Sequence, residues 1–277
     1  MWGGHSCPPP LTLLLICCEQ MSQVGDMTRQ TSSKTLSSSE RSFQSHVALI
    51  TGATRGIGLA IARSLATKGC NLIVTGRDHS ALDRISRELS RLEIQVLAQP
   101  CDIRDPDSVD DLFRSLRRQF KHLDILINNA GIAHANLPVE RLPFPVWKSV
   151  IETNLDGTFL VTQAALAMMK RGGTIVNNLS IAANRVFAGS AAYNASKHGA
   201  LGLTNTLREE LRPKGIRVIG LLPGATDTDI WKTLWPEAPR RKMLSPATVA
   251  EAVVNAILLP ENATVETLEI LPTAGTL

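Results

Sequence analysis

The strongest constraint on this chain is an alternation of short apolar runs with longer segments of helical periodicity, which begins near His46. The short runs are rich in Val, Ile and Leu, as strands buried on both faces require. The predicted strands cover residues 47–51, 71–75, 94–99, 123–128, 173–178, 217–222 and 267–271. The predicted helices cover residues 56–68, 80–92, 106–120, 145–170, 191–212 and 246–258. This order predicts one α/β domain, a doubly wound seven-stranded parallel sheet flanked by helices on both faces.

The folded part of the chain is expected to begin well after its first residue. The 277 residues, 44% of them hydrophobic, suffice for one sizeable domain. Residues 22–45 are instead rich in Ser, Thr and Gln, and bury too little apolar surface to offset the entropy of ordering. We therefore expect a disordered extension over residues 1–44, with Met21 or Met27 as an alternative start, and a folded domain over residues 45–277.

Charge and apolar patterning argue against several functions. The 29 basic and 25 acidic residues are interspersed and leave a formal net charge of only +4, so no nucleic-acid partner is predicted. The apolar run over residues 11–18 is too short to span a bilayer, and no Lys or Arg precedes it as in a secretory signal. The five cysteines are odd in number and lack metal-ligand spacing. We expect a cytoplasmic protein with no metal site and no membrane partner.

A glycine-rich turn joins the first predicted strand to the first predicted helix. Gly52, Gly56 and Gly58 fall at this junction in the segment VALITGATRGIGLAIA. Glycine lets the backbone turn tightly and approach a pyrophosphate, while the N–H groups and dipole of the helix N-terminus attract the anion. The order of strand, turn and helix therefore predicts dinucleotide binding, with a flexible glycine-rich loop as the alternative.

The end of the second predicted strand indicates which dinucleotide is bound. Dinucleotide-binding turns commonly place an acidic residue there to hold the ribose 2′-hydroxyl of NAD. This chain has Arg77 at that tip and Arg55 in the glycine turn, and two guanidinium groups suit the 2′-phosphate of NADP(H). Asp78 follows directly and keeps NAD open, and a third interpretation is that both arginines are simply solvated.

Tyr193 and Lys197 are the candidate chemical groups. They lie four residues apart in a segment of helical periodicity, so both side chains project from one face. A cation near a phenol typically lowers its pKa by ~1–3 units, which favours proton transfer at working pH. Tyr193 is the only tyrosine in the chain, so no other phenol competes. The same spacing also occurs on ordinary amphipathic helices, and further residues must decide.

Three more polar residues fall where such a site needs them. Ser180 follows one predicted strand and Asn129 closes another, so both lie at the carboxyl edge where open α/β sheets bind ligands. Asn154 stands among apolar residues in a predicted helix, so a buried hydrogen-bonding role is expected.

Taken together, these residues resemble the short-chain dehydrogenase/reductase family over about residues 46–275. The matching motifs are TGATRGIG from Thr51 to Gly58, NNAG from Asn128 to Gly131, Ser180, YxxxK from Tyr193 to Lys197, and Pro223-Gly224 followed by Thr228. The resemblance implies a Rossmann-type fold and an NADP(H)-dependent oxidoreductase acting on a carbonyl or alcohol. It also implies a homodimer or homotetramer, which members of the family commonly form.

The resemblance implies roles for individual residues. Tyr193 would protonate the carbonyl oxygen and Ser180 would hydrogen-bond it. Lys197 would bind the nicotinamide ribose and lower the tyrosine pKa, and Asn154 would hold a water of the proton relay. Asp102 would contact the adenine. The implied cofactor contacts are Gly52, Thr54, Arg55, Gly56, Ile57, Gly58, Arg77, Asp102, Asn129, Ala130, Gly131, Tyr193, Lys197, Pro223, Gly224, Thr226 and Thr228.

The substrate is bounded less tightly. A small-molecule or acyl carbonyl is expected, in a pocket walled by residues 133–142, 181–189 and 224–244. Residues 224–245, with two tryptophans, are typical of a lid or of an anchored surface helix. Residues 240–242 are interpreted as a solvated basic run rather than an acyl-carrier contact. The alternative functions are an NAD-linked alcohol dehydrogenase and a catalytically silent cofactor-sensing regulator, although the regulator should have lost one of its four catalytic positions.

Overall fold

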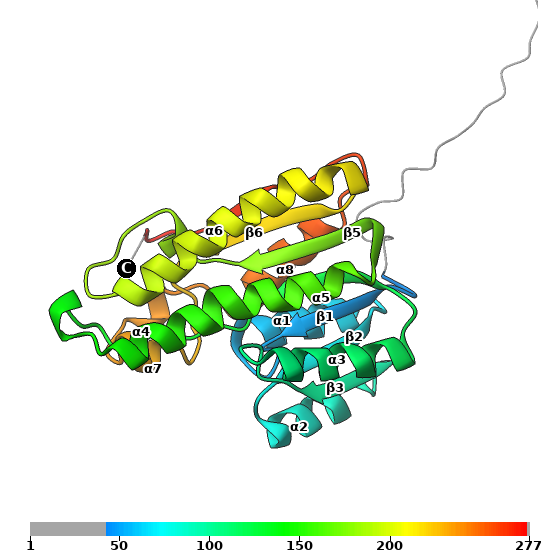
Figure 1. Ribbon diagram of the computed structural model, residues 1–277, viewed down its shortest axis with the longest axis horizontal. Coiled ribbons are helices and arrows are strands. Elements are labelled where there is room, and N and C mark those ends of the chain that lie inside the picture. The colour runs from blue at the N-terminus through cyan, green and yellow to red at the C-terminus, as the bar shows by residue number, and fades with distance from the viewer. Residues whose placement is uncertain (1–42, 276–277) are drawn as a thin grey trace, which may run out of the picture. The chain divides into compact units, whose positions relative to one another are not determined.

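The computed structural model describes residues 43–275, which form one parallel sheet and two layers of helices (Figure 1). The strands are β1 (Val47–Thr51), β2 (Asn71–Gly76), β3 (Val96–Pro100), β4 (Leu123–Asn128), β5 (Met169–Asn178), β6 (Arg217–Pro223) and β7 (Thr267–Ile270). The α-helices are α1 (Gly56–Ala66), α2 (His79–Leu89), α3 (Pro106–Gln119), α4 (Phe144–Ile151), α5 (Gly157–Leu166), α6 (Ala191–Leu211), α7 (Trp231–Leu234) and α8 (Pro246–Ile257). The predicted fold class is confirmed.

The strand order is β3-β2-β1-β4-β5-β6-β7, and every neighbouring pair is parallel. The order reverses between β1 and β4, because the chain winds first to one edge of the sheet and then to the other. At such a point the segments that follow the two strands diverge and leave a crevice at the carboxyl edge.

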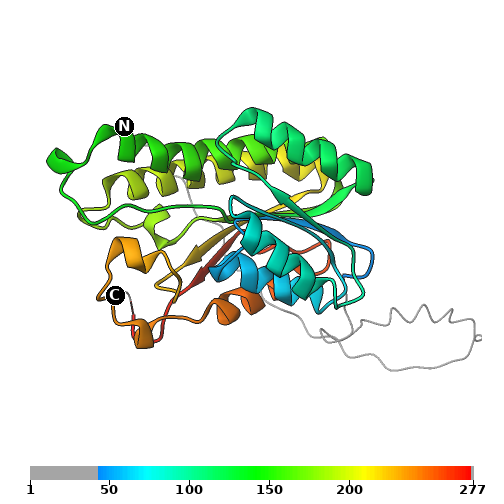
Figure 2. The same ribbon diagram turned by 90° about the horizontal axis from the view of Figure 1, so that it is seen from below.

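Helices cover both faces of the sheet, as Figure 2 shows with the sheet between the two layers. Alternate residues of each central strand feed the two cores, since successive side chains point to opposite faces. Ala48 and Ile50 of β1 pack in the core under α1, α2 and α8. Val47 and Leu49 pack in the core under α3, α5 and α6. This double burial explains why the strands appear in the sequence as nearly unbroken apolar runs. None of the helices within residues 43–275 is long and apolar enough to cross a membrane.

The helix predicted over residues 145–170 forms over residues 144–166, but a π turn divides it. The structure has α4, a π turn over Glu152–Asp156 and then α5. A π turn closes with hydrogen bonds to the fifth residue along, so the helical faces before and after it fall out of phase. The apolar periodicity of the sequence does not reveal it, because each half keeps its own helical spacing.

The next strand begins earlier than predicted. β5 starts at Met169 rather than at residue 173, and Met169 pairs with Leu123 before a shift in register. Lys170 and Arg171 are exposed in this first part of the strand. The apolar run in the sequence therefore starts only after them.

The segment 224–245 is more regular than predicted. It contains the short helix α7 and a 3-10 turn over Arg240–Lys242. The indole nitrogen of Trp231 donates to the carbonyl of Thr226 at 2.8 Å, which fastens the segment to itself.

Phe43 places the start of the packed domain before the predicted boundary at residue 45. Its side chain is buried, its N–H donates to the carbonyl of Lys68 at 2.9 Å, and its ring meets that of His46 edge-on. An isolated aromatic residue in a Ser- and Gln-rich stretch carries too weak a pattern to show this. Residues 1–42 of the predicted disordered extension, which include the apolar run over residues 11–18, lie outside the described residues.

Candidate active site

The carboxyl ends of the strands border a cleft of ≈ 1190 Å³ that crosses the switch point. Two predicted site residues, Gly58 and Asn154, do not line it. The predicted residues that do are Gly52, Thr54, Arg55, Gly56, Ile57, Arg77, Asp102, Asn129, Ala130, Gly131, Ser180, Tyr193, Lys197, Pro223, Gly224, Thr226 and Thr228. The structure therefore brings the predicted phosphate-binding turn and the predicted chemical groups into one continuous space.

The N-terminus of α1 opens into this cleft, where the guanidinium of Arg55 pairs with Asp229 at 3.8 Å. Gly52 and Gly56 have φ of +63° and +57°, which side chains rarely adopt. Within the described chain, Arg55 at the start of α1 makes no capping hydrogen bond and the first turn has no acidic residue, whereas Asp78 caps α2. The N–H groups and dipole of α1 are thus free for an anion, and the turn fits a pyrophosphate.

Gly58 packs beneath the turn, and its predicted contact with the cofactor stays a prediction. A Cβ there would collide with the side-chain nitrogen of Asn129 and with the carbonyl oxygen of Gly52. Asn129 itself is fully engaged. Its Nδ2 donates to the carbonyls of Thr51 and Gly52 at 3.0 and 3.1 Å, and its Oδ1 accepts from Asn178 at 2.9 Å. Asn129 therefore lines the cleft and also holds the shape of the glycine turn.

The end of the cleft over β1 and β2 is open and basic. Arg77 is exposed there, and Arg84 of α2 lines the same region. Arg84 was not predicted as a site residue, because an arginine on a helix with many charged residues is usually assigned to the solvent-exposed face. Asp78 uses its Oδ1 to accept from the N–H of Ala81 at 3.0 Å. Asp78, which kept NAD open, thus commits one carboxylate oxygen to capping α2.

Asp102 follows β3 and is held by a residue that the sequence analysis missed. The guanidinium of Arg104 lies 2.5 Å from its carboxylate, and the backbone N–H of Arg104 also donates to it at 3.1 Å. These bonds hold the pKa of Asp102 below its usual range, so the carboxylate stays ionised. The signal that could have revealed this ion pair is the presence of two opposite charges two residues apart in the segment CDIRD.

Ser180 follows β5 in a strained backbone conformation. Its φ is +94° and its ψ is 155°, a region that is essentially limited to glycine and costs about 1–3 kcal/mol. The carbonyl of Leu221 holds it there by accepting from the N–H groups of Leu179 and Ser180 at 2.8 and 3.3 Å. Strain of this kind is retained where the surroundings over-determine it, commonly at active sites. It directs the predicted serine into the cleft.

Tyr193 and Lys197 line the cleft from one face of α6, as predicted. The Nζ of Lys197 lies 5.6 Å from the centroid of the tyrosine ring and donates to the carbonyl of Asn178 at 2.8 Å. Burial lowers the pKa of Lys197 to about 8, because desolvation disfavours the ammonium form. Lys197 is therefore poised between its charged and neutral forms near physiological pH.

The pKa of Tyr193 moves in the direction opposite to the prediction. Burial raises it, and the hydrogen bond with the Ser180 side chain opposes that effect only in part. The prediction considered the nearby cation and left out desolvation, which here acts on both members of the pair. The phenol is consequently protonated and ready to donate at neutral pH.

Asn154 lies in the π turn, behind the cleft rather than in it. Its Oδ1 accepts from the N–H of Ile132 at 2.9 Å, and its Nδ2 donates to the carbonyl of Ile132 at 2.9 Å and to the hydroxyl of Ser196 at 3.0 Å. Ser196 is fully buried and donates to the carbonyl of Tyr193 at 2.8 Å. The Asn154 amide thus links the segment after β4 to α6, and its predicted role of holding a water stays a prediction. Ser196 was missed because nothing in the sequence links it to Asn154.

The segment after β6 runs along the cleft to the tryptophans. Thr226 is buried and its hydroxyl donates to the carbonyl of Gly224 at 3.0 Å. Thr228 packs against the glycine turn, and a Cβ on Gly56 would lie 3.1 Å from its methyl group. Both threonines line the cleft, as predicted.

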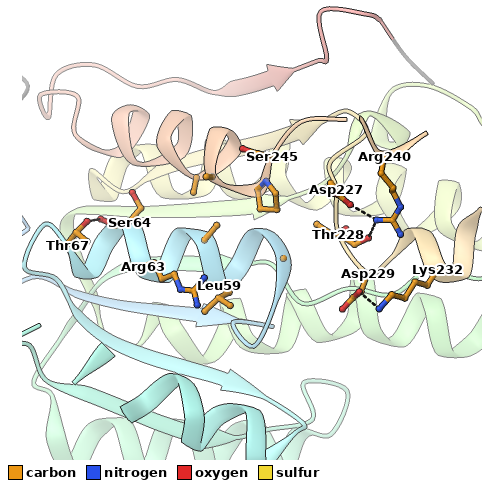
Figure 3. Close-up of a pocket in the computed structure, with 15 residues that line it drawn as sticks. Leu59, Arg63, Ser64, Thr67, Asp227, Thr228, Asp229, Lys232, Arg240 and Ser245 are labelled. Carbon is orange, nitrogen blue, oxygen red and sulfur yellow. Dashed lines mark hydrogen bonds and ion pairs between the residues drawn. The ribbon is translucent and has the colours of Figure 1, made fainter. Parts of the chain in front are cut away.

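A second cavity of ≈ 950 Å³ lies on the other side of this segment, between α1 and α8 (Figure 3). Arg240 donates there to the carboxylate of Asp227 at 2.6 Å and to the carbonyl of Thr228 at 2.7 Å. Lys232 pairs with Asp229 at 2.6 Å. Arg240 is therefore a paired residue that braces the segment, which corrects its interpretation as part of a solvated run.

Comparison with known proteins agrees with this geometry. The chain matches the short chain dehydrogenase family over residues 46–239 and belongs to that family of oxidoreductases, as the motifs predict. A putative ketoacyl reductase from Streptomyces coelicolor is 35% identical over 254 residues, covering 83% of this chain and 96% of the relative.

Two solved structures share the fold. An alcohol dehydrogenase from Thermococcus sibiricus in complex with 5-hydroxy-NADP has a TM-score of 0.77 and 32% identity, covering 82% of this chain and 97% of that one. A short chain dehydrogenase from Burkholderia cenocepacia in complex with NADP has a TM-score of 0.77 and 30% identity, covering 85% and 99%.

Proposed function

We propose that this oxidoreductase reduces a carbonyl to an alcohol with NADPH, and that Tyr193 is its acid. When bound, NADPH supplies the hydride that reduces the carbonyl carbon. Tyr193 gives its proton to the carbonyl oxygen, so one hydride and one proton convert the carbonyl to the alcohol. Ser180 donates a hydrogen bond to the same oxygen and stabilises the charge that develops there.

Lys197 completes this arrangement. As Tyr193 loses its proton, the phenolate that develops is stabilised by the ammonium of Lys197, whose Nζ lies 5.6 Å from the ring centroid. The same ammonium is placed to donate to a hydroxyl of the nicotinamide ribose. Asn154 and Ser196 hold the catalytic helix through their hydrogen bond of 3.0 Å. The observation that carries the proposal is the convergence of Ser180, Tyr193 and Lys197 in the cleft that also receives the glycine turn.

NADP(H) is favoured over NAD(H) by the charges at the open end. Arg55, Arg77 and Arg84 line the cleft on the side of β1 and β2, where guanidinium groups suit the dianionic 2′-phosphate. The competing acidic residue, Asp78, is occupied by the N–H of Ala81. The complexes of the two solved structures with NADP-type cofactors agree with this choice.

The direct test is oxidation of NADPH by the full chain in the presence of a panel of ketones, diketones and β-ketoacyl thioesters, with NADH in parallel. Tyr193→Phe should lower kcat by about 10²–10⁴-fold, as expected for loss of a general acid, and change NADPH affinity little. Trp147→Ala, outside the cleft, serves as the control. NADPH binding without turnover of any carbonyl would instead favour the silent regulator, and a preference for NADH would favour the NAD-linked dehydrogenase.

Assembly and location also remain predictions. Phe159 is 47% exposed on α5 and lies near Leu160 and Leu203, which supports the predicted homodimer or homotetramer through this helix. Light scattering of the purified chain tests the assembly. A cytoplasmic location rests on composition alone, and fractionation of cells tests it.

A further inference from the structure

The wall of the cleft beyond Tyr193 is apolar and aromatic. Two segments form it, the loop after β5 and the lid segment after β6. The loop contributes Val186 and Phe187, and the lid contributes Trp231, Leu234 and Trp235. Val186 is 79% exposed and Trp235 44% exposed, so both offer apolar surface that nothing in the described chain covers. We call this wall the aromatic wall.

The lid divides its side chains between two cavities. Its apolar residues face the active-site cleft, whereas Lys232 and Arg240 line the second cavity and are paired there with carboxylates (Figure 3). The cations of the lid are therefore directed away from the substrate.

The loop after β5 also keeps its cation out of the cleft. Arg185, next to Val186, pairs with Glu269 of β7 at 2.8 Å, and Asn184 donates to the same carboxylate at 3.5 Å. This link holds the loop against the edge strand and leaves Val186 and Phe187 toward the cleft.

The cations that do line the cleft lie elsewhere. Among the described residues that border it, these are Arg55, Arg77, Arg84 and Lys197. The three arginines belong to the end over β1 and β2, and Lys197 is engaged with Asn178 and stands beside the tyrosine. A carboxylate seated between Phe187 and the lid tryptophans would give up part of its hydration without gaining a charged partner, which is unfavourable. An apolar group would gain from burial against the same surface.

We propose that the substrate of this site is an uncharged carbonyl compound with a bulky apolar, preferably aromatic, group that packs between Phe187 and the two lid tryptophans. This inference rests on the proposed function, since it takes the carbonyl to lie at Tyr193. Keto acids and anionic carriers are disfavoured by the same arrangement.

The test compares two ligands with the same reacting ketone, ethyl benzoylformate and benzoylformate, which differ in an ester against a carboxylate. Their binding is measured by NADPH fluorescence on the complex of Tyr193→Phe with NADPH, in which reduction is suppressed. The ester should bind about tenfold or more tightly than the acid. Equal or tighter binding of the acid, or saturation by neither ligand, would overturn the inference.

A second measurement locates the apolar contact. Trp235→Ala, in the same Tyr193→Phe background, should weaken binding of the ester about tenfold, as expected when an aromatic face is lost, and leave NADPH affinity within about twofold. Phe144→Ala removes an aromatic side chain that is 72% exposed outside the cleft and should change neither. Loss of ester binding in both variants, or in neither, would contradict the aromatic wall.

Turnover by the unaltered enzyme separates this inference from the proposed function. Reduction of benzoylformate in preference to the ester would overturn the inference and leave the proposed function standing. Selective binding of the ester without reduction of any carbonyl would support the ligand class and overturn the proposed function.

Discussion

The two ends of the cleft deal with charge in opposite ways. Over β1 and β2 the arginines stay in water, where each interaction is weak, additive and screened by salt. Over β5 and β6 the lysine and tyrosine are withdrawn from water, and desolvation shifts the pKa of both. The first end is suited to collecting an anionic cofactor and the second to moving a proton. Cofactor choice should therefore respond to salt and to single arginines, whereas the chemistry should respond to pH.

The largest expected effect comes from titrating the buried end. The pH profile of kcat/KM for NADPH reports groups of the free enzyme. Lys197 is charged below its pKa of about 8 and neutral above it. Because its charge stabilises the phenolate that develops on Tyr193, kcat/KM for reduction should fall as pH rises above about 8, by up to about tenfold per pH unit. The raised pKa of Tyr193 keeps the phenol protonated across this range.

Lys197→Arg is the matched control, because a guanidinium stays charged throughout. Its activity is expected to be lower, so each profile is normalised to its own maximum. The decline near pH 8 should disappear. A decline that persists unchanged in the arginine variant would show that another group titrates.

The open end should yield an effect of similar size that is selective for one cofactor. Arg77→Ala should lower kcat/KM for NADPH about tenfold to hundredfold, the range expected for loss of hydrogen bonds to a charged group, and leave that for NADH unchanged. The deficit should shrink as ionic strength rises. Arg87→Ala provides the control, since Arg87 is exposed on α2 but does not line the cleft. If kcat/KM falls equally with NADPH and NADH, Arg77 does not recognise the 2′-phosphate.

The hydrogen bond between Ser196 and Asn154, which supports the buried end of the cleft, should contribute to the free energy of unfolding. Ser196→Ala leaves the Nδ2 of Asn154 with one acceptor fewer in a buried place, so the free energy of unfolding should fall by about 1–3 kcal/mol. Urea denaturation measures it. Thr206→Ala removes an exposed hydroxyl of the same helix that donates to the carbonyl of Gly202, and should have a much smaller effect. If the two variants lose the same free energy of unfolding, the hydrogen bond between Ser196 and Asn154 contributes no more to stability than an exposed one.

The smallest effect is expected at the surface. Arg63 and Glu88 form a short ion pair of 2.6 Å, but their side chains are 54% and 41% exposed. Solvent and side-chain entropy offset most of its Coulomb energy, so Arg63→Ala should cost less than about 1 kcal/mol of unfolding free energy. Steady-state kinetics should be unchanged. Any change in the KM for NADPH would show that the cavity of Figure 3 is coupled to the active-site cleft.

The same contrast explains how far the sequence could be interpreted. The central strands were located because doubly buried strands leave continuous apolar runs, although β3 and β7 at the edges are only partly buried. Tyr193 and the glycine turn were located because their spacing is local. The π turn, the pairing of Asn154 with Ser196 and the engagement of Arg240 were not located. The two contacts join segments that are distant in sequence. The π turn is a change in hydrogen-bond spacing within a helix, which the amino-acid composition does not show.

The direction of the tyrosine pKa was missed for a related reason. The sequence shows that Lys197 lies within reach of Tyr193, but the degree of burial of both groups is set by β5, β6 and the loops around them. The proximity of the two side chains is encoded within about one helical turn, whereas their desolvation depends on the whole fold.

The π turn at Glu152–Asp156 bears on how this chain can change length over time. Surface loops tolerate inserted or deleted residues. Removing one residue from this turn would close it into a regular α-helix and leave the faces of α4 and α5 in place, because a π turn holds one residue more than an α turn. Asn154 makes its hydrogen bonds to Ile132 and Ser196 from inside this turn, so such a deletion would break those bonds without displacing the packed helices. The turn is therefore a place where the chain can lose a residue and keep its fold, but lose the support of α6.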